Sequence, residues 1–391
     1  MNENIFLFIT NIFIFVLCAG MFIIVPQITR KSFLFGVKIP PEEASCREAL
    51  DMKKRYMLSC AAGITALLAV CVLQFVFFRE LTLLATLYMP LFIIIIYLAA
   101  FIPSWKKAVR LKEEKGWAVS NILFAETNSS HTRGSLSMLP YGWYISGFFI
   151  ILAVIITVVM RYPVLGDSIP MHFNYNMEPD RWVDKSWWTV LQIPLLSAGL
   201  LLLMFFVAVS IEKAKLQVDP HNPRLSFAQH QVYRRRMGHA IGFVTIIMLL
   251  IISFSQFLYL FPDAAVWSLA GGKFSLWCIA ILTIFMVTPV VIFYVKTGQG
   301  GCKVKINIDE LYEADAAEST VKKSTAQGRG DDKFWLLGLF YYNRDDPAVI
   351  VEARFGAKLN FNYAHLSVKI GLAVFLLALA ALYKWMTVMI I

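Results

Sequence analysis

The chain has 391 residues, of which 58% are hydrophobic and only 16% are charged. A soluble core cannot bury that much apolar surface beneath a polar exterior, so the composition excludes a soluble globular protein and predicts an integral membrane protein. The formal net charge of +10 lies largely in connectors beside apolar runs, where membrane orientation and anionic lipid explain it better than nucleic-acid binding does.

Residues 1–140 contain three apolar runs that are each long enough to cross a bilayer as a helix, namely Ile5–Val25, Met57–Phe78 and Leu81–Ile102. The connectors after the first and third runs are rich in Lys and Arg, which marks the cytoplasmic side of a membrane protein. We expect four side chains of the first connector to set orientation and to hold anionic lipid: Arg30, Lys53, Lys54 and Arg55.

Residues 141–211 contain two further runs, Tyr141–Met160 and Trp188–Ile211, and a polar connector between them that we expect to be extracellular. Its three prolines fix φ and remove backbone donors, so it is predicted to be a shaped loop. It also concentrates donors, acceptors and both charges, which makes it the strongest candidate for a ligand site. The predicted ligand-binding residues are His172, Asn174, Asn176, Glu178, Asp180 and Arg181.

His172 admits three interpretations. It could be a hydrogen-bonded structural histidine, a contact to a ligand, or, together with neighbouring carboxylates, a ligand of a divalent metal. Metal ligands are normally spaced more tightly and repetitively than the residues of this connector. We therefore predict no metal site and no cofactor.

Residues 212–296 begin with a basic connector that contains Arg234, Arg235 and Arg236, which we again assign to orientation and lipid contact. Two more runs follow, Ala240–Phe261 and Phe274–Val295. Residues 297–330 are predicted to be a cytoplasmic tether, 331–363 a cytoplasmic aromatic domain, and 364–391 the last helix, Leu366–Ile390. The predicted fold is an all-α integral membrane protein, a bundle of about eight transmembrane helices with a small cytoplasmic aromatic-rich module before the last helix and both termini outside.

The aromatic domain places Trp335, Phe340, Tyr341 and Tyr342 close together in the sequence. So much aromatic surface beside a membrane needs burial. Either the domain lies against the inner leaflet or the basic connectors, or these four side chains dock a cytosolic partner. Its second half, Val349–Phe355, is predicted to form one short helix.

The sequence lacks the motifs that would indicate catalysis or ion-coupled transport. No Asp, Glu or His occupies the middle of an apolar run, which disfavours proton- or sodium-coupled transport. No HExxH, GxSxG or phosphate-binding lysine loop is present, and Gly298, Gly300 and Gly301 are interpreted as a flexible exit from the seventh helix. We expect no catalytic residues and no enzyme activity.

Three stretches resemble bacterial membrane proteins. The sequence IPMHFN at 169–174, followed by EPDRW at 178–182, resembles a domain of unknown function that is shared with the immunity proteins against the sporulation-delay killing peptide. The basic connector with FGVKIP at 35–40 resembles the first loop of those proteins. The sequence FWLLGLFYYNRDDP at 334–347, followed by VEARFG at 351–356, resembles a second uncharacterised bacterial domain.

The resemblance implies a polytopic plasma-membrane protein of a Gram-positive bacterium. In the immunity branch such proteins protect against a secreted peptide and hold a cytosolic repressor at the membrane. We therefore expect a non-enzymatic immunity or sensor protein whose partners are the lipid bilayer, an extracellular peptide and a cytosolic repressor or other regulator, with no nucleic acid. The main alternative is an uncoupled transporter or permease component, and a membrane enzyme that uses His172 is a third.

Overall fold

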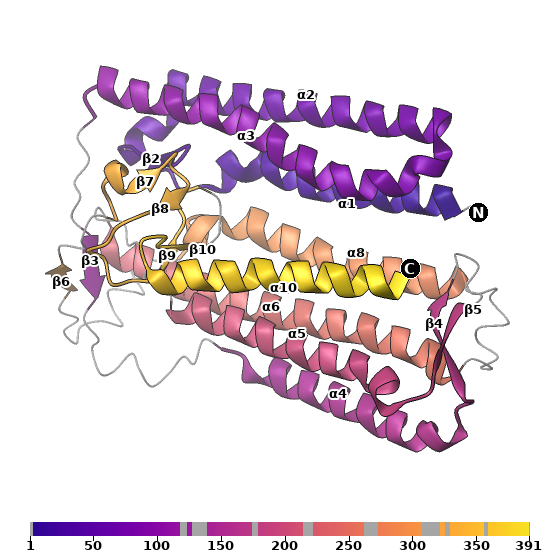
Figure 1. The fold of residues 1–391 in the computed structure, drawn as a ribbon. Coiled ribbons are helices and arrows are strands. Elements are labelled where there is room, and N and C mark those ends of the chain that lie inside the picture. Colours follow the sequence, from indigo (N-terminus) through magenta and orange to yellow (C-terminus); the bar gives the residue numbers. More distant parts are fainter. Residues whose placement is uncertain are drawn as a thin grey trace. The chain divides into compact units, whose positions relative to one another are not determined.

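The computed structural model describes residues 3–117, 123–126, 139–173, 179–213, 222–261, 273–306, 321–324, 329–355 and 359–390. Within these residues, seven helices are long and apolar enough to cross a membrane. They are α1 (Glu3–Ile28), α2 (Arg47–Phe77), α3 (Thr82–Glu114), α4 (Tyr141–Arg161), α5 (Trp187–Lys213), α6 (Pro223–Leu260) and α8 (Lys273–Thr297), which Figure 1 labels. The chain is thus a helical multi-pass membrane protein.

The eighth predicted run also forms a helix, α10 (Leu366–Ile390). Its apolar stretch among the described residues is Leu366–Leu377, which is shorter than a full span. Phe375 and Leu376 on this stretch are exposed, as expected of apolar side chains that face lipid.

Several helices continue past the apolar runs into residues that were predicted to form connectors. α2 begins at Arg47 instead of Met57, and α6 begins at Pro223 instead of Ala240, so Lys53–Arg55 and Arg234–Arg236 are helical. The loops predicted there are wrong because hydropathy detects where apolar residues stop, whereas backbone hydrogen bonds continue into polar sequence.

The described chain divides into two compact units. The first comprises Gly134–Lys213 and Gln231–Lys296 with the N-terminal Met1–Leu7, and it holds α4, α5, α8 and most of α6. The second comprises Phe8–Arg133, Ala214–His230 and Thr297–Ile391.

In the second unit, α2 and α3 form an antiparallel helical hairpin with α1 beside it (Figure 1). The connector from α1 to α2 contains the short strands β1 (Phe33–Leu34) and β2 (Val37–Lys38), which pair antiparallel. Phe35 and Gly36 make the turn between these strands with φ of +48° and +81°. Positive φ at both turn residues matches the twist of a tight β-hairpin but is costly for a bulky residue such as Phe35.

The residues before α10 form a small β-structure, which we call the C-terminal module (residues 329–363). Strands β7 (Trp335–Leu336) and β8 (Phe340–Tyr341) pair with each other, as do β9 (Ile350–Glu352) and β10 (Leu359–Phe361). The short helix predicted over Val349–Phe355 is therefore wrong. The β-branched sequence Val349-Ile350-Val351 favours a strand, and β10 supplies its partner.

A second strand pair joins distant parts of the same unit. β3 (Leu123–Glu126) pairs antiparallel with β6 (Val321–Ser324), which lies in the segment that was predicted to be a tether. An aromatic cluster then ties the module to the first connector. The ring of Phe35 lies 5.6 Å from that of Phe355 and 5.3 Å from that of Tyr56 on α2, and Phe101 on α3 lies 4.9 Å from Phe355. The module thus packs on a basic connector, one of the placements that the sequence left open.

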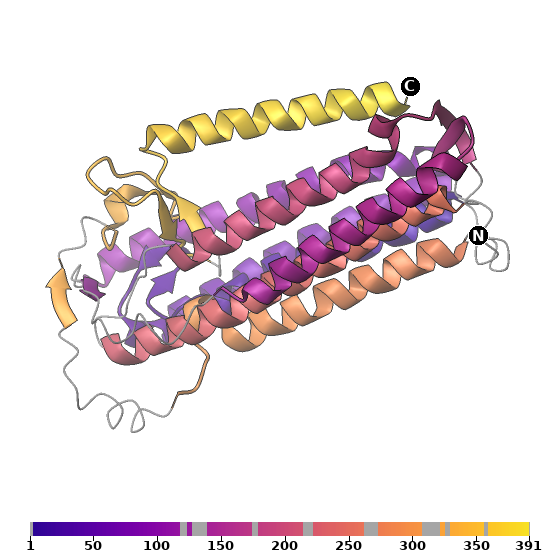
Figure 2. The same cartoon turned by 90° about the horizontal axis from the view of Figure 1, so that it is seen from below.

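In the first unit, the connector between α4 and α5 forms a β-hairpin whose two strands have six residues each. Strands β4 (Ser168–Phe173) and β5 (Pro179–Asp184) pair antiparallel with irregular register between Pro170 and Phe173. Both views place this hairpin at the end of the unit where α4 ends and α5 begins (Figures 1 and 2). The sequence predicted a shaped loop here but not the strand pairing.

Candidate functional site

The β4–β5 hairpin packs on apolar helices through Ile169, with Met171 beside it. Ile169 on β4 is 1% exposed and packs in a cluster with Val154 and Val158 of α4, Val190 of α5 and Leu260 of α6. Because these residues come from three helices of the same unit, the base of the hairpin is fixed to the helical scaffold. This cluster explains why position 169 of the connector is occupied by an apolar residue.

Lys185 closes the base of the hairpin from the other side. Its backbone N–H donates to the carbonyl of Asp167 at 2.8 Å, and its Nζ donates to the carbonyl of Leu165 at 2.8 Å. The same ammonium lies 5.1 Å from the ring centroid of Tyr162, which stacks on Trp187 at 3.8 Å. Lys185 therefore has a structural role, because it joins the end of β5 to the residues before β4.

The predicted ligand-binding residues are distributed along this hairpin. His172 is the register partner of Arg181, so the two residues stand opposite each other on β4 and β5. Asp180 is exposed and precedes Arg181 on β5. The remaining three predicted residues, Asn174, Asn176 and Glu178, lie outside the described residues. The structure thus brings His172, Asp180 and Arg181 together on one hairpin.

Large aromatic side chains surround these polar residues. Trp182 on β5 is 53% exposed, and Trp187 and Trp188 at the start of α5 are 48% and 64% exposed. Indole rings with one apolar face and one polar N–H favour the membrane–water boundary and are also common in binding surfaces. This end of the unit therefore presents both charges and exposed aromatic surface.

A polar cluster in the second unit was not predicted. We call it the Arg30 cluster, and it consists of Arg30, His230, Gln299 and Glu352. Arg30 follows α1, and its guanidinium Nη2 contacts His230 Nε2 at 2.7 Å and forms an ion pair with Glu352. Its backbone N–H donates to Gln299 Oε1 at 3.1 Å. The cluster joins four segments of the chain, and Arg30 has a specific structural role in addition to the orientation role that the sequence suggested.

The glycines after α8 make this cluster possible. Gly300 has φ of +57°, and a side chain there would lie 2.6 Å from His230 Cε1 and 2.8 Å from Glu352 Oε1. Gln299 in the same turn donates from Nε2 to the carbonyl of Ala353 at 2.5 Å. The segment that was interpreted as a flexible exit forms a tight turn whose backbone approaches the cluster closely.

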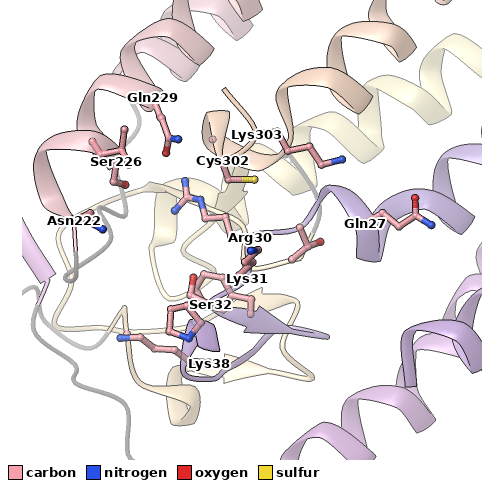
Figure 3. Close-up of a pocket in the computed structure, with 16 residues that line it drawn as sticks. Gln27, Arg30, Lys31, Ser32, Lys38, Asn222, Ser226, Gln229, Cys302 and Lys303 are labelled. Atoms are coloured by element: carbon pink, nitrogen blue, oxygen red, sulfur yellow. The ribbon is translucent and has the colours of Figure 1, made fainter. Parts of the chain in front are cut away.

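A pocket of about 510 Å³ opens beside the Arg30 cluster. Four segments line it: the end of α1 with the connector after it, the start of α6, the turn after α8, and Gly330 of the C-terminal module. Figure 3 shows the side chains of Ser226, Gln229 and Cys302 gathered near the Arg30 guanidinium, with Lys38 and Ser32 on the opposite wall. The lining contains four basic side chains, namely Arg30, Lys31, Lys38 and Lys303, and no acidic residue among those that the structure describes.

The other predicted basic residues are not in this pocket. Lys53 donates to the carbonyl of Ala44 at 3.0 Å, while Lys54 and Arg55 are exposed on α2. In the first unit, Arg234 donates to the carbonyl of Glu212 at 2.8 Å. Arg235 and Arg236 are exposed on the same helix.

Arg354 is the most deeply buried charge of the C-terminal module. It is 0% exposed, forms an ion pair with Asp332, and donates to the carbonyl of Gly36 at 3.2 Å and to that of Arg329 at 2.9 Å. Asp332 is shared with Lys112 of α3, whose Nζ lies 2.6 Å from Oδ2. Burial lowers the pKa of Arg354 to about 10, although Asp332 opposes the shift, so the guanidinium stays charged at neutral pH.

A second buried carboxylate organises the interior of the module. Asp346 accepts two hydrogen bonds from Arg329, at 2.5 and 2.6 Å, one from the Tyr341 hydroxyl at 2.8 Å and one from the Ala348 N–H at 3.0 Å. Burial alone would raise the pKa of Asp346, but these donors hold it below its ordinary value. Asp346 is thus an ionised hydrogen-bond acceptor at the centre of the module.

Two of the four aromatic residues predicted to dock a partner are buried inside the module. Trp335 is 3% exposed and Tyr341 is 0% exposed, and their rings pack together at 5.0 Å. They form the core of the module because strands alternate side chains between two faces. Phe340, which is 43% exposed, and Tyr342, which is half-buried, remain on the surface.

Comparison with known families supports part of the resemblance. A family model described as a domain of unknown function, DUF1648, matches residues 148–198, which cover most of α4, the whole β4–β5 hairpin and the start of α5. No curated protein matches the chain, and no solved structure matches it. The matched region is thus a unit of helix, hairpin and helix whose function is not assigned.

Proposed function

We propose that the protein is a non-enzymatic plasma-membrane protein of the toxin-immunity or sensor type, which binds an extracellular peptide at the β4–β5 hairpin. One observation carries this proposal. The hairpin is fixed at its base by Ile169 and Lys185 while Asp180, Arg181 and Trp182 lie on its strand β5. A fixed element with both charges and an aromatic surface is suited to recognition.

The strand geometry favours a peptide as the ligand. Among the described residues β4 and β5 form a two-stranded sheet, so each strand has one outer edge. An extended peptide can add to such an edge through main-chain hydrogen bonds, while side chains on the hairpin supply specificity. Arg181 would donate to carboxylates or carbonyls of the peptide, and Asp180 would accept from its cationic groups.

The proposed topology has eight spans, with α10 as the last and with both termini extracellular. It rests on the distribution of Lys and Arg, which places the connectors after α1, α3 and α5 and the segment after α8 on the cytoplasmic side. In this arrangement the C-terminal module lies in the cytoplasm. Its surface residues Phe340 and Tyr342 are the candidates for contact with a cytosolic repressor or other regulator.

A family-model match and a motif resemblance both support the hairpin as the site in this proposal. The DUF1648 match covers the hairpin, and the IPMHFN and EPDRW motifs within it resemble those of immunity proteins against the sporulation-delay peptide. On that resemblance we propose that the protein comes from a Gram-positive bacterium and protects it from a secreted peptide.

A survival assay tests the proposal. The protein is expressed in a strain that is sensitive to a sporulation-delay-type peptide, and survival is compared with that of cells carrying Asp180→Ala with Arg181→Ala. We expect protection by the unmodified protein and its loss in the variant at equal abundance.

The chain offers a matched control in Arg79→Ala with Glu80→Ala. This pair also removes one acid and one base from neighbouring positions, but in the connector between α2 and α3. The control should protect as well as the unmodified protein. Equal protection by both variants, or no protection by the unmodified protein, would refute peptide immunity at the hairpin.

A further inference from the structure

We infer that the pocket beside the Arg30 cluster binds a phosphate group, carried either by an anionic lipid or by a small soluble molecule. This site lies in the second unit and is separate from the hairpin of the proposed function. The inference rests on the size of the pocket, the charge of its lining and the distribution of its neutral donors.

The pocket has the dimensions of a ligand site. Its volume of about 510 Å³ falls within the roughly 300–1,000 Å³ that is typical of pockets for small molecules. Its walls come from segments far apart in the sequence, so the pocket exists only when the unit is folded. It is therefore a formed cavity and not a groove along one helix.

The charge of the lining selects an anion. Arg30, Lys31, Lys38 and Lys303 line the pocket, and the described lining contains no Asp or Glu. Clustered cations repel one another and raise the free energy of the empty site, and a bound anion removes that cost. A single carboxylate would neutralise one of these charges, whereas a phosphate brings up to two charges and several acceptor oxygens.

Arg30 is already positioned for this role. Glu352, His230 and the Gln299 backbone hold its guanidinium from the side of the cluster, with Nε donating to the carbonyl of Gln299 at 3.4 Å. Because these contacts already fix the Arg30 guanidinium, ligand binding costs it little further conformational entropy. The Glu352 carboxylate offsets the charge of Arg30, so the positive charge of the lining comes from Lys31, Lys38 and Lys303.

Neutral donors complete the lining. Ser32 and Ser226 line the pocket with hydroxyl-bearing side chains and Asn222 with an amide, whereas the Thr29 hydroxyl and the Gln229 amide donate to the carbonyls of Val25 and Val304. Such groups donate to phosphate oxygens and commonly accompany Lys and Arg in phosphate sites. The lining thus combines point charges with short-range donors, which is the composition that a tetrahedral anion requires.

The pocket lies near the ends of two membrane helices, so phosphate can reach it from two sources. Its lining begins at Gln27, near the end of α1, and includes Gly300, shortly after α8 ends. Both helices are apolar enough to cross a membrane, so the pocket lies at the level where lipid headgroups meet water. A headgroup can reach it from the bilayer, and a soluble phosphate can reach it from water.

Two binding measurements on the purified full-length protein separate these sources. In neutral detergent, inorganic pyrophosphate is titrated and binding is followed by calorimetry. In nanodiscs of phosphatidylcholine with or without phosphatidylglycerol, retained lipid is measured by native mass spectrometry. Pyrophosphate binding indicates a soluble ligand, whereas retention of phosphatidylglycerol without pyrophosphate binding indicates a lipid headgroup.

The test variant is Lys31→Gln with Lys303→Gln, which removes two charges from the lining. We expect the affinity of the ligand that binds to fall about tenfold or more, because charge-assisted hydrogen bonds to phosphate are the strong ones. Lys31→Gln alone is measured as well, since this side chain is exposed and its loss should not unfold the protein.

The matched control is Lys106→Gln with Lys107→Gln. These two lysines are exposed on α3 and do not line the pocket, so the control changes net charge equally without changing the site. Its affinity should stay within about twofold of the unmodified protein, because neither lysine lines the pocket and exposed charges are screened by salt. Absence of binding in both measurements, or an equal loss in both double variants, would overturn the inference.

Discussion

Gly36 packs directly on the backbone of Gly338, so closely that a methyl group on Gly36 would overlap the Gly338 carbonyl oxygen. One glycine lies in the turn between β1 and β2, and the other follows β7 in the C-terminal module. Each follows a bulky residue with positive φ, Phe35 at +48° and Leu337 at +54°. Two strained turns therefore meet and hold the first connector against the module.

Replacing Gly36 with alanine should destabilise the protein strongly. The substitution adds both the cost of positive φ and a clash with backbone that cannot move aside, and we expect a loss of about 3 kcal/mol or more in the free energy of unfolding. The melting temperature in detergent measures the effect.

Gly116→Ala separates the cost of positive φ from the cost of the backbone clash. Gly116 has φ of +61° but no atom within 4 Å of an added Cβ, so this variant carries only the backbone strain. It should lose about 1 kcal/mol. Equal melting temperatures for the two variants would show that Gly36 does not pack on Gly338.

Arg354→Ala should be among the most damaging single changes in the module. It would leave Asp332 without its buried partner and remove donors to the carbonyls of Gly36 and Arg329. Asp332 is 32% exposed and keeps its ion pair with Lys112, so the loss comes from the buried Arg354 side chain and its donors, and we expect about 2–3 kcal/mol in the free energy of unfolding. Arg344→Ala, on an exposed side chain of the same module, should change stability by less than about 0.5 kcal/mol. A similar melting temperature for both variants would contradict the buried network.

Acid should weaken the module through Asp346. Its pKa is lower in the folded protein than in the unfolded chain, so the folded state binds fewer protons. The stabilisation is fully present above the ordinary Asp pKa of about 3.9 and is lost as the pH falls through the lower folded value. The melting temperature of Asp346→Asn should lie below that of the unmodified protein at pH 7, and the difference should shrink below about pH 4. A difference that stays constant with pH would exclude an ionised Asp346.

Ile169→Ala should loosen the β4–β5 hairpin from its helices. Ile169 is 1% exposed in a cluster of aliphatic side chains, and truncating such a residue costs about 2–5 kcal/mol. We expect faster amide hydrogen exchange at Ser168–Phe173 in this variant. Val164→Ala, at a position that is 69% exposed, is the comparison and should leave exchange unchanged. Unchanged exchange in both would show that the cluster does not fix the hairpin.

The membrane helices were predictable because apolar length is a local property of the sequence. The run Tyr141–Met160, for example, became α4 (Tyr141–Arg161) almost residue for residue. The helical ends were not predictable in this way, since α2 and α6 continue into polar sequence that hydropathy assigns to connectors.

The Arg30 cluster was not predictable because its members are distant in sequence and individually unremarkable. Arg30 was recognised only as one of many basic residues near a membrane, and Glu352 only as part of a motif. A signal was nevertheless present in the glycines after α8. Gly300 is required there by its φ of +57° and by the approach of His230, which a flexible segment would not need.

The orientation of the hairpin is the most direct test of the proposed function, and cysteine labelling in intact cells measures it. One variant carries Ser168→Cys and the other retains native Cys302, each with the remaining cysteines replaced; both positions are exposed in the structure. An impermeant maleimide should label Ser168→Cys in intact cells and Cys302 only after permeabilisation. The reverse pattern would place the hairpin in the cytoplasm and contradict recognition of an extracellular peptide.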